Sequence, residues 1–433
     1  MTDAQDLFRS RFEIRRELGA GGMGTVHLAY DAFLQREVAI KLANLKLLED
    51  PEVGYRMQKM WMNETRLAGK LRHPHIVELF EAGTTEEFGY LVMEFVAGGT
   101  LKQYTTPDRL LPFEQVIEHV YKICNALAYA NKIGLLHRDI KPANIMLTSD
   151  RQVKVADFGT AYFSASEETQ VFDVGTLPYM PPEHFRNWPP TLQLDIYAVG
   201  VLAYQLLTGS LPFTADSFDA LLKQKLAGEF VPLESRRTEV SNDVRFVVHR
   251  AMHPDPQVRY DSWEAFCDDL SVALPQFNRP NEVLFDTARF DTLRHLSFFI
   301  GFEDTQLWET IHLSHWHDFG DGETVFEEGS SGDSVYIIAK GEAAVIRAGA
   351  TLNRLAPGEC LGEIAYLDEV RHARTATIRA NSPLVLIEIP AAGLRNASPE
   401  LQAAFGRAFM RVMVKRIQHA DQRYLNLLRT TGG

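Results

Sequence analysis

Two short polar runs carry the side chains of this chain that could do chemistry. Residues 137–144 read HRDIKPAN, and residues 156–159 read ADFG. Between them, two apolar triplets are separated by a turn-like tetrapeptide, a pattern that predicts a hairpin bringing Asn144 close to Asp157. Amide and carboxylate oxygens are hard ligands, and Mg²⁺ takes one or two of them beside phosphates and waters. The two runs therefore predict a magnesium site suited to a phosphate-bearing substrate.

A glycine-rich stretch upstream could hold that phosphate. Residues 18–26 read LGAGGMGTV and fit the pattern GxGxxGxV, in which missing Cβ atoms let the backbone close over phosphates. A single match of this kind is as often an ordinary turn. An apolar strand ending in Lys41 follows, and this lysine can reach the α- and β-phosphates. A helical pattern over 57–71 presents Glu64 as its candidate partner.

Taken together and in this order, the motifs over residues 12–272 resemble those of a serine/threonine protein kinase. The resemblance implies transfer of a phosphoryl group from ATP to a Ser or Thr hydroxyl of a protein substrate, with Mg²⁺ as cofactor. Asp139 would orient the hydroxyl and accept its proton. Lys141 is the form typical of serine/threonine kinases and would contact the transferring phosphate. Lys41, paired with Glu64, completes the implied catalytic set.

The same resemblance implies a metal pair and a nucleotide pocket. Asn144 and Asp157 would hold Mg²⁺, and residues 93–96 would form the hinge beside the adenine. Met93 and Met146 could equally be plain core residues, and their places next to the motifs favour the pocket. The residues carried over as ATP contacts are Leu18, Gly19, Gly21, Gly22, Gly24, Val26, Ala39, Lys41, Met93, Glu94, Val96 and Met146.

Further features fit the same class of enzyme. Residues 175–180, GTLPYM, resemble the loop that binds the acceptor peptide in serine/threonine kinases. Glu183 and Arg259 would form a structural ion pair, and the apolar run 195–207 would be the buried helix that anchors the catalytic loop. Arg138 precedes the catalytic aspartate, and in kinases of this type that arginine pairs with a phosphorylated loop residue. The candidates for phosphorylation are Thr169, the best placed, with Ser164 and Ser166.

Length and composition leave room for more than one domain. The chain has 433 residues, of which 45% are hydrophobic, so a largely disordered protein is excluded. A net charge of −13 argues against a non-specific nucleic-acid binder, which needs a basic face. Three widely separated cysteines predict a reducing compartment and offer no metal-site spacing. With neither a signal peptide nor a stretch of spanning length, we expect a cytoplasmic protein without a membrane span; the oligomeric state is open.

The chain changes its pattern after a proline-punctuated linker, residues 273–292. Over residues 293–420, short alternating strands separated by glycine turns predict a β-roll or jelly roll with flanking helices, closed by a helical run over 401–428. Residues 421–433 would be a short tail. The expected fold is therefore α+β, a bilobal kinase fold followed by a β-roll domain.

The second domain resembles cyclic-nucleotide-binding domains. The match rests on residues 327–342 and on a phosphate cassette over 361–377. It implies binding of cyclic AMP or cyclic GMP, with Glu363 accepting from the ribose 2′-hydroxyl and Arg374 pairing with the cyclic phosphate. Arg371 lies between them as a rival phosphate ligand. The implied nucleotide-binding residues are Gly362, Glu363, Ala365, Arg374 and Thr375.

Three functions stay open for this pair of domains. The first is a signalling kinase regulated in cis by a cyclic nucleotide and by phosphorylation of its own loop. In the second, the kinase is active and the C-terminal domain is a ligand-free autoinhibitory module or a docking surface for substrates. In the third, a kinase-like scaffold transfers no phosphate, although Lys41, Asp139 and Asp157 are all present and argue against it.

Overall fold

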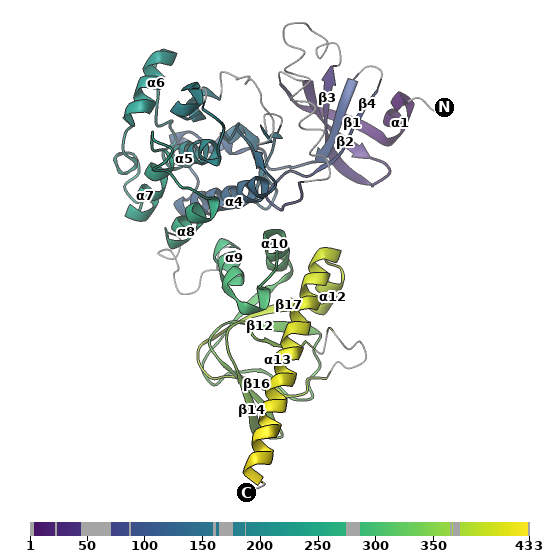
Figure 1. Cartoon of the computed structure of the whole chain (residues 1–433). Helices are drawn as coiled ribbons and strands as arrows, with labels where there is room; N and C mark the ends of the chain where they lie inside the picture. Colours follow the sequence, from purple (N-terminus) through teal and green to yellow (C-terminus); the bar gives the residue numbers. More distant parts are fainter. Residues whose placement is uncertain are drawn as a thin grey trace. The chain divides into compact units, whose positions relative to one another are not determined.

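The computed structural model divides the chain into two compact units, Met1–Glu282 and Val283–Gly433 (Figure 1). Each unit mixes helices with antiparallel sheets, which confirms the expected α+β fold. The predicted linker includes the point of division, and its limits stay a prediction. The structure describes residues 4–21, 24–44, 71–85, 88–158, 162–163, 176–186, 188–273, 286–363, 366 and 373–431.

A five-stranded antiparallel sheet forms the first part of the N-terminal unit, with the strand order β1-β2-β3-β5-β4. Its strands run over Phe12–Gly21 (β1), Gly24–Asp31 (β2), Arg36–Asn44 (β3), Leu79–Thr84 (β4) and Phe88–Glu94 (β5). Alternate residues of β3, Val38 and Ile40, are fully buried, as the period of a strand requires. Helix α1 (Ala4–Arg11) adds Phe8 to the same apolar cluster. The strands that flank the glycine-rich stretch therefore belong to one packed sheet.

Helices form the second part of the N-terminal unit. Their bounds are Phe113–Lys132 (α4), Leu192–Thr208 (α5), Phe218–Ala227 (α6), Asn242–Ala251 (α7) and Trp263–Ala273 (α8). Helix α5 is apolar on nearly every side and lies buried against α4 and α7, which confirms the helix predicted over 195–207. It ends at Gly209, which has a φ of +72° and at which a Cβ atom would lie 2.4 Å from the Pro107 backbone nitrogen.

Short strand pairs and turns complete this unit. Strand β6 (Leu135–Leu136) pairs with β9 (Tyr162–Phe163), and β7 (Ile145–Leu147) pairs with β8 (Val153–Val155). The second pair is the hairpin that the sequence predicts between its two polar runs. Short 3₁₀ helices lie at Leu101–Tyr104, Pro107–Arg109, Pro142–Asn144, Leu177–Tyr179, Pro182–Arg186 and Leu233–Ser235.

A buried ion pair ties the chain after residue 180 to the helical core. Arg259 donates to both Glu183 carboxylate oxygens, at 2.6 and 2.8 Å. The same guanidinium donates to the backbone carbonyls of Gln193, His253 and Pro254. The arginine side chain is 0% exposed and the glutamate side chain 6%, so both charges are shielded from water. The predicted pair is therefore present and fully desolvated.

Two four-stranded antiparallel sheets form the C-terminal unit, with the orders β10-β17-β12-β15 and β11-β16-β13-β14. Their strands run over His315–Phe319 (β10), Thr324–Phe326 (β11), Ser334–Lys340 (β12), Ala343–Arg347 (β13), Ala350–Leu355 (β14), Cys360–Leu361 (β15), Thr377–Ala380 (β16) and Leu384–Pro390 (β17). Ile338, Leu355 and Leu386 belong to one apolar cluster that draws residues from both sheets. This arrangement confirms the predicted β-roll.

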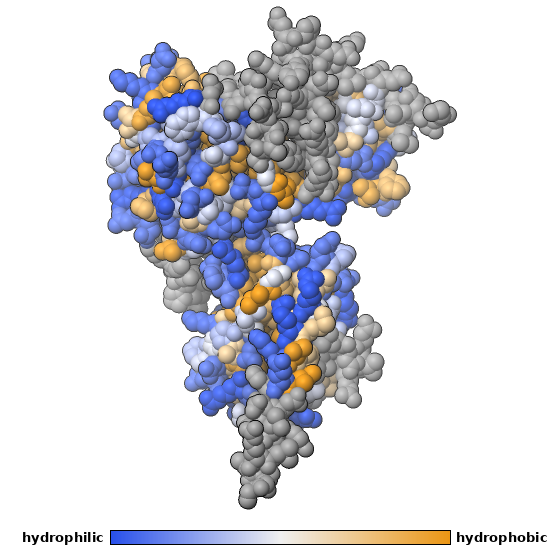
Figure 2. All heavy atoms as spheres, viewed as in Figure 1, coloured by the Kyte–Doolittle hydropathy of each residue, from blue (hydrophilic) through white to orange (hydrophobic). Residues whose placement is uncertain are grey.

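Helices precede and follow the β-roll in the sequence. They run over Asp286–His295 (α9), Ser297–Phe299 (a 3₁₀ turn), Asp304–Leu313 (α10), Ala391–Arg395 (α12) and Pro399–Thr431 (α13). Helix α13 contacts α10 and buries Leu401 and Phe405. Its outer side exposes Met410, Val414 and Ile417, and Figure 2 shows an apolar patch along this helix on a mostly hydrophilic face. Within the described ranges, none of the helices combines the length and apolarity needed to span a bilayer.

We expect Arg259→Met to destabilise the N-terminal unit by about 3–5 kcal/mol, because removing one partner leaves the Glu183 carboxylate buried without its cation. Urea unfolding followed by circular dichroism measures the loss. Arg15→Met is the matched control, since the Arg15–Glu37 pair is more than 40% exposed on both sides and contributes at most about 1 kcal/mol. Equal losses in the two variants would contradict the structural role assigned to Arg259.

Candidate active site

Asp195, in the first turn of α5, fixes the run of residues 137–144. Its carboxylate accepts hydrogen bonds from the backbone N–H groups of His137, at 2.8 Å, and Arg138, at 2.7 Å. The side chain is buried, and burial raises the pKa of this carboxyl, while His137 and the two N–H groups act in the opposite direction. Arg138 has a φ of +68°, a conformation that costs free energy for a residue other than glycine. The Asp195 carboxylate therefore holds this run in a strained turn.

Three side chains converge on the Asp139 carboxylate. Thr176 donates to Oδ1 at 2.8 Å, Asn144 donates to Oδ2 at 3.0 Å, and the Lys141 ammonium lies 2.9 Å from Oδ2. Lys141 also donates to the Thr176 hydroxyl at 3.0 Å. Asp139 is buried, so these hydrogen bonds fix the orientation of its carboxylate. The structure thus brings three of the predicted site residues together and adds Thr176 to them.

Asp157 lies just beyond the hairpin and next to Lys41. It has a φ of +64°, and its carboxylate, 47% exposed, lies 3.5 Å from the Lys41 ammonium. The preceding residue, Ala156, donates its N–H to the Asn144 carbonyl at 2.8 Å and shares a hydrogen bond with the His137 ring through its own carbonyl. These backbone contacts hold Asn144 and Asp157 in one region. An amide oxygen and a half-exposed carboxylate are a donor set that fits Mg²⁺.

Most of the other residues predicted to contact ATP lie on the five-stranded sheet, whereas Met146 lies on β7 and Val96 lies just beyond β5. A Cβ atom at Gly24, which has a φ of +148°, would lie 1.8 Å from the Leu42 carbonyl oxygen, so this position requires glycine. Met93 faces Ala39 in the pairing of β5 with β3, and Glu94 forms an ion pair with Lys154 at 2.9 Å. Residues predicted for the sites that lie outside the described part of the chain are Gly22, Glu64, Ser164, Ser166, Thr169 and Ala365.

The β-roll holds a cavity of about 300 Å³ that is lined from both of its sheets. Among the predicted nucleotide-binding residues, Gly362, Glu363, Arg374 and Thr375 line it. Glu363 and Arg374 are both buried, and Arg374 donates to the Ser334 carbonyl at 3.0 Å. The Arg374 guanidinium lies 4.4 Å from the centre of the Phe326 ring. A Cβ atom at Gly362 would lie 2.4 Å from the Arg374 Nη1 atom. Arg374 is thus held at the cavity wall, where its charge suits an anion.

A second arginine reaches the same cavity from helix α13. Arg416 lines the cavity and donates through Nη1 to the Glu363 carboxylate. Its Nη2 donates to the Cys360 carbonyl at 2.5 Å. Helix α13 is therefore bonded to Glu363, the expected ribose acceptor of the predicted phosphate cassette, and to Cys360, the residue just before that cassette.

Comparison with known families identifies the two units. Residues 12–270, more than half of the chain, match the family model described as Protein kinase domain. The chain belongs to the protein kinase family. Downstream of this kinase domain, residues 316–398 match the model described as Cyclic nucleotide-binding domain, so the cavity of the β-roll lies in a domain of that family.

Relatives of this kinase domain include bacterial serine/threonine kinases. The chain is 36% identical over 268 residues to serine/threonine-protein kinase PknB of Mycobacterium leprae. That alignment covers 60% of this chain and 42% of the relative. It is 35% identical over 277 residues to serine/threonine-protein kinase PrkC of Bacillus subtilis. That alignment covers 64% of this chain and 42% of the relative. The chain spans less than half the length of these relatives.

Sequence reasoning missed two side chains of these sites. Thr176 lies in the predicted acceptor-peptide loop, but nothing in its spacing shows that its hydroxyl meets Asp139. Arg416 lies on a long helix where an arginine usually faces water, and sequence periodicity gives no sign that it turns toward Glu363. Both contacts join segments far apart in the chain, so they arise from tertiary packing.

We expect Asp195→Asn to loosen the catalytic run of the kinase domain. The amide offers one oxygen to the two N–H donors of His137 and Arg138, so one buried donor loses its partner at a cost of about 1–3 kcal/mol. Hydrogen exchange of these two amides, followed by mass spectrometry, should become faster. Asp219→Asn, at an exposed position of α6, is the control and should leave exchange unchanged. Exchange at the wild-type rate in Asp195→Asn would contradict the role of Asp195 in holding this run.

Proposed function

We propose that this chain transfers the γ-phosphoryl group of ATP to Ser or Thr hydroxyls of protein substrates, with Mg²⁺ as cofactor. The observation that carries the proposal is the buried Asp139 carboxylate, oriented by Thr176, Lys141 and Asn144. A base held in this way can orient a hydroxyl and take its proton. The chain's membership of the protein kinase family and its similarity to serine/threonine kinases support the same reaction.

Each charged residue of the site then has a part in phosphoryl transfer. Asn144 and Asp157 would hold the metal, which supplies positive charge to the phosphates. Lys41 would bind the α- and β-phosphates, and its place beside Asp157 supports this role. Lys141, bonded to Asp139, would offset the negative charge that spreads over the transferring group. In this reaction the protein positions charges and forms no covalent bond to the phosphoryl group.

A non-enzymatic scaffold is the competing reading of this fold. A scaffold needs no oriented carboxylate, whereas Asp139 here is bonded through both oxygens to side chains from two segments of the chain. Lys41 and Asp157 are likewise present and lie within 3.5 Å of each other. These contacts favour catalysis over nucleotide binding alone.

We expect Asp139→Asn to lower the rate of phosphorylation at least about 100-fold, because the amide cannot accept the proton of the hydroxyl. Binding of ATP, measured by calorimetry, should change little. Transfer of labelled phosphate to myelin basic protein measures the rate, and chelation of Mg²⁺ by EDTA should abolish it. Asp216→Asn, at an exposed position, is the matched control and should keep wild-type activity. Full activity in Asp139→Asn would overturn the catalytic assignment.

We further propose that a cyclic nucleotide, cyclic AMP or cyclic GMP, binds the β-roll cavity and regulates the kinase domain in cis. Buried Arg374 would pair with the cyclic phosphate, and Glu363 would accept from the ribose 2′-hydroxyl. Because Arg416 of α13 is bonded to Glu363, a ligand at that carboxylate would act on the helix as well. Useful control requires a coupling free energy of only about 1–3 kcal/mol.

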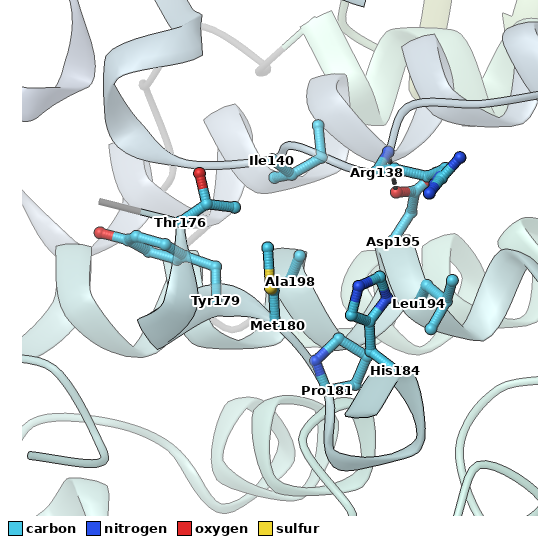
Figure 3. A pocket seen from close by; sticks show the side chains of 10 residues that line it. All are labelled: Arg138, Ile140, Thr176, Tyr179, Met180, Pro181, His184, Leu194, Asp195 and Ala198. Carbon is cyan, nitrogen blue, oxygen red and sulfur yellow. Dashed lines mark hydrogen bonds between the residues drawn. The ribbon is translucent and has the colours of Figure 1, made fainter. Parts of the chain in front are cut away.

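Loop phosphorylation is a second proposed input. Arg138 and Thr176 line the same small pocket (Figure 3), so the Arg138 guanidinium belongs to a region at the end of the segment that carries the candidate acceptors. A phosphate on that segment could pair with this cation. Thr169, Ser164 and Ser166 remain the candidate acceptors. This input would act directly on the catalytic run, because Arg138 belongs to that run and is bonded through its N–H to Asp195.

We expect at least one of the two cyclic nucleotides to bind the full chain and to change its phosphorylation of myelin basic protein. Arg374→Ala should weaken that binding at least about tenfold, since a charge-assisted hydrogen bond contributes about 1.5–3 kcal/mol. Calorimetric titration measures affinity, and Arg354→Ala, at an exposed position of β14, is the control. Absence of binding by both nucleotides would favour the rival reading, a ligand-free autoinhibitory or docking module.

A further inference from the structure

Helix α6 carries a lysine whose side chain points into the protein. Lys225 is 0% exposed, whereas Lys223, two residues earlier, is exposed. The Lys225 ammonium donates to three backbone carbonyls, those of Leu177 at 3.0 Å, Pro178 at 2.8 Å and Met180 at 2.5 Å. An ammonium has three N–H donors, so the segment 177–180 takes up its full donor capacity.

The surroundings of Lys225 make its charge costly. The nitrogen lies 5.4 Å from the Tyr197 ring centre and 5.8 Å from the Phe213 ring centre. Burial lowers the pKa of this lysine to about 7, and the charge of Glu183 acts in the opposite direction. That glutamate is already bonded to Arg259 through both oxygens. An apolar side chain of similar length would fill the space without this penalty, so packing alone does not account for a lysine here.

The segment that Lys225 holds leads directly to the catalytic aspartate. Thr176, the residue before it, donates to Asp139 and accepts from Lys141. Figure 3 shows Thr176, Tyr179, Met180 and Ile140 around a small pocket between this segment and the catalytic run. The pocket has a volume of about 10 Å³, the space of a single water. With so little free volume, a shift of the segment would move the Thr176 hydroxyl.

We propose that Lys225 is a positioning residue that fixes residues 177–180 as the surface on which the acceptor peptide lies. The proposal rests on the proposed kinase function, because the segment matters to the reaction only if a protein substrate binds there. Backbone carbonyls bonded to one ammonium form a rigid clamp, which leaves the peptide-facing side of the segment in a defined place. If the segment shifts, the acceptor peptide loses a pre-formed surface, so loss of this clamp should weaken binding of the protein substrate without affecting that of ATP.

The test compares Lys225→Met, Lys225→Arg and Lys223→Met in the full chain, with myelin basic protein as the acceptor. We expect Lys225→Met to raise the KM for this protein at least tenfold and to leave the KM for ATP within twofold of the wild type. Lys225→Arg keeps the charge and several donors, so its KM for the protein should lie closer to the wild-type value. Lys223→Met, on the exposed side of α6, should match the wild type in both constants.

Other outcomes distinguish failure of the proposed kinase function from failure of the role proposed for Lys225. If the wild-type chain phosphorylates neither itself nor myelin basic protein, the proposed kinase function fails and this inference fails with it. If the wild type is active and Lys225→Met has an unchanged KM for the protein, the inference alone is wrong. An equal rise in both KM values, or unfolding of Lys225→Met at the assay temperature, would make Lys225 a general structural residue and would also overturn the inference.

Discussion

The Asp195 carboxylate is the constraint on which the rest of the kinase site depends. Two backbone N–H groups converge on it, and one of them belongs to Arg138, whose φ is +68°. A residue in this region costs about 1–3 kcal/mol, whereas a hydrogen bond to a charged group contributes about 1.5–3 kcal/mol. Two such bonds therefore offset the strain. Without the carboxylate, the run 137–144 would relax and the place of Asp139 would be lost.

From that anchor, contacts spread in two directions. On one side the His137 ring bonds the Ala156 carbonyl, which places Asp157 next to Lys41. On the other side Asp139 accepts from Thr176, whose neighbours at 177–180 are bonded to a buried ammonium of α6. The proposed metal-binding side is thus connected to the buried helix α5, and the proposed acceptor side to Lys225, the buried residue of the largely exposed helix α6. The geometry of the proposed site therefore depends on one side chain from each of two helices, Asp195 and Lys225, and not on the loops alone.

The sequence predicts what is local and leaves open what is tertiary. Motif order indicated the kinase fold, and turn signals located the hairpin β7–β8, because both depend on near neighbours. The Glu183–Arg259 pair was predicted from family resemblance although 76 residues separate its members. Lys225 and Arg416 could not be predicted, since each lies on a helix where a basic residue normally faces water. Only the packing of that helix against a loop or cavity turns the side chain inward.

The C-terminal domain, like the kinase domain, has a basic side chain that connects a helix to the proposed site. Arg416 of α13 is bonded to Glu363 at the edge of the cavity; the Glu363 side chain is buried and that of Arg416 is 39% exposed, so water screens this pair in part. Because of this screening, the pair contributes less than the roughly 1.5–3 kcal/mol of a fully buried hydrogen bond to a charged group. In the proposed binding mode, a ribose hydroxyl at Glu363 would share this carboxylate with Arg416. Under the proposed function, a ligand bound in the cavity would therefore act directly on helix α13 through this carboxylate.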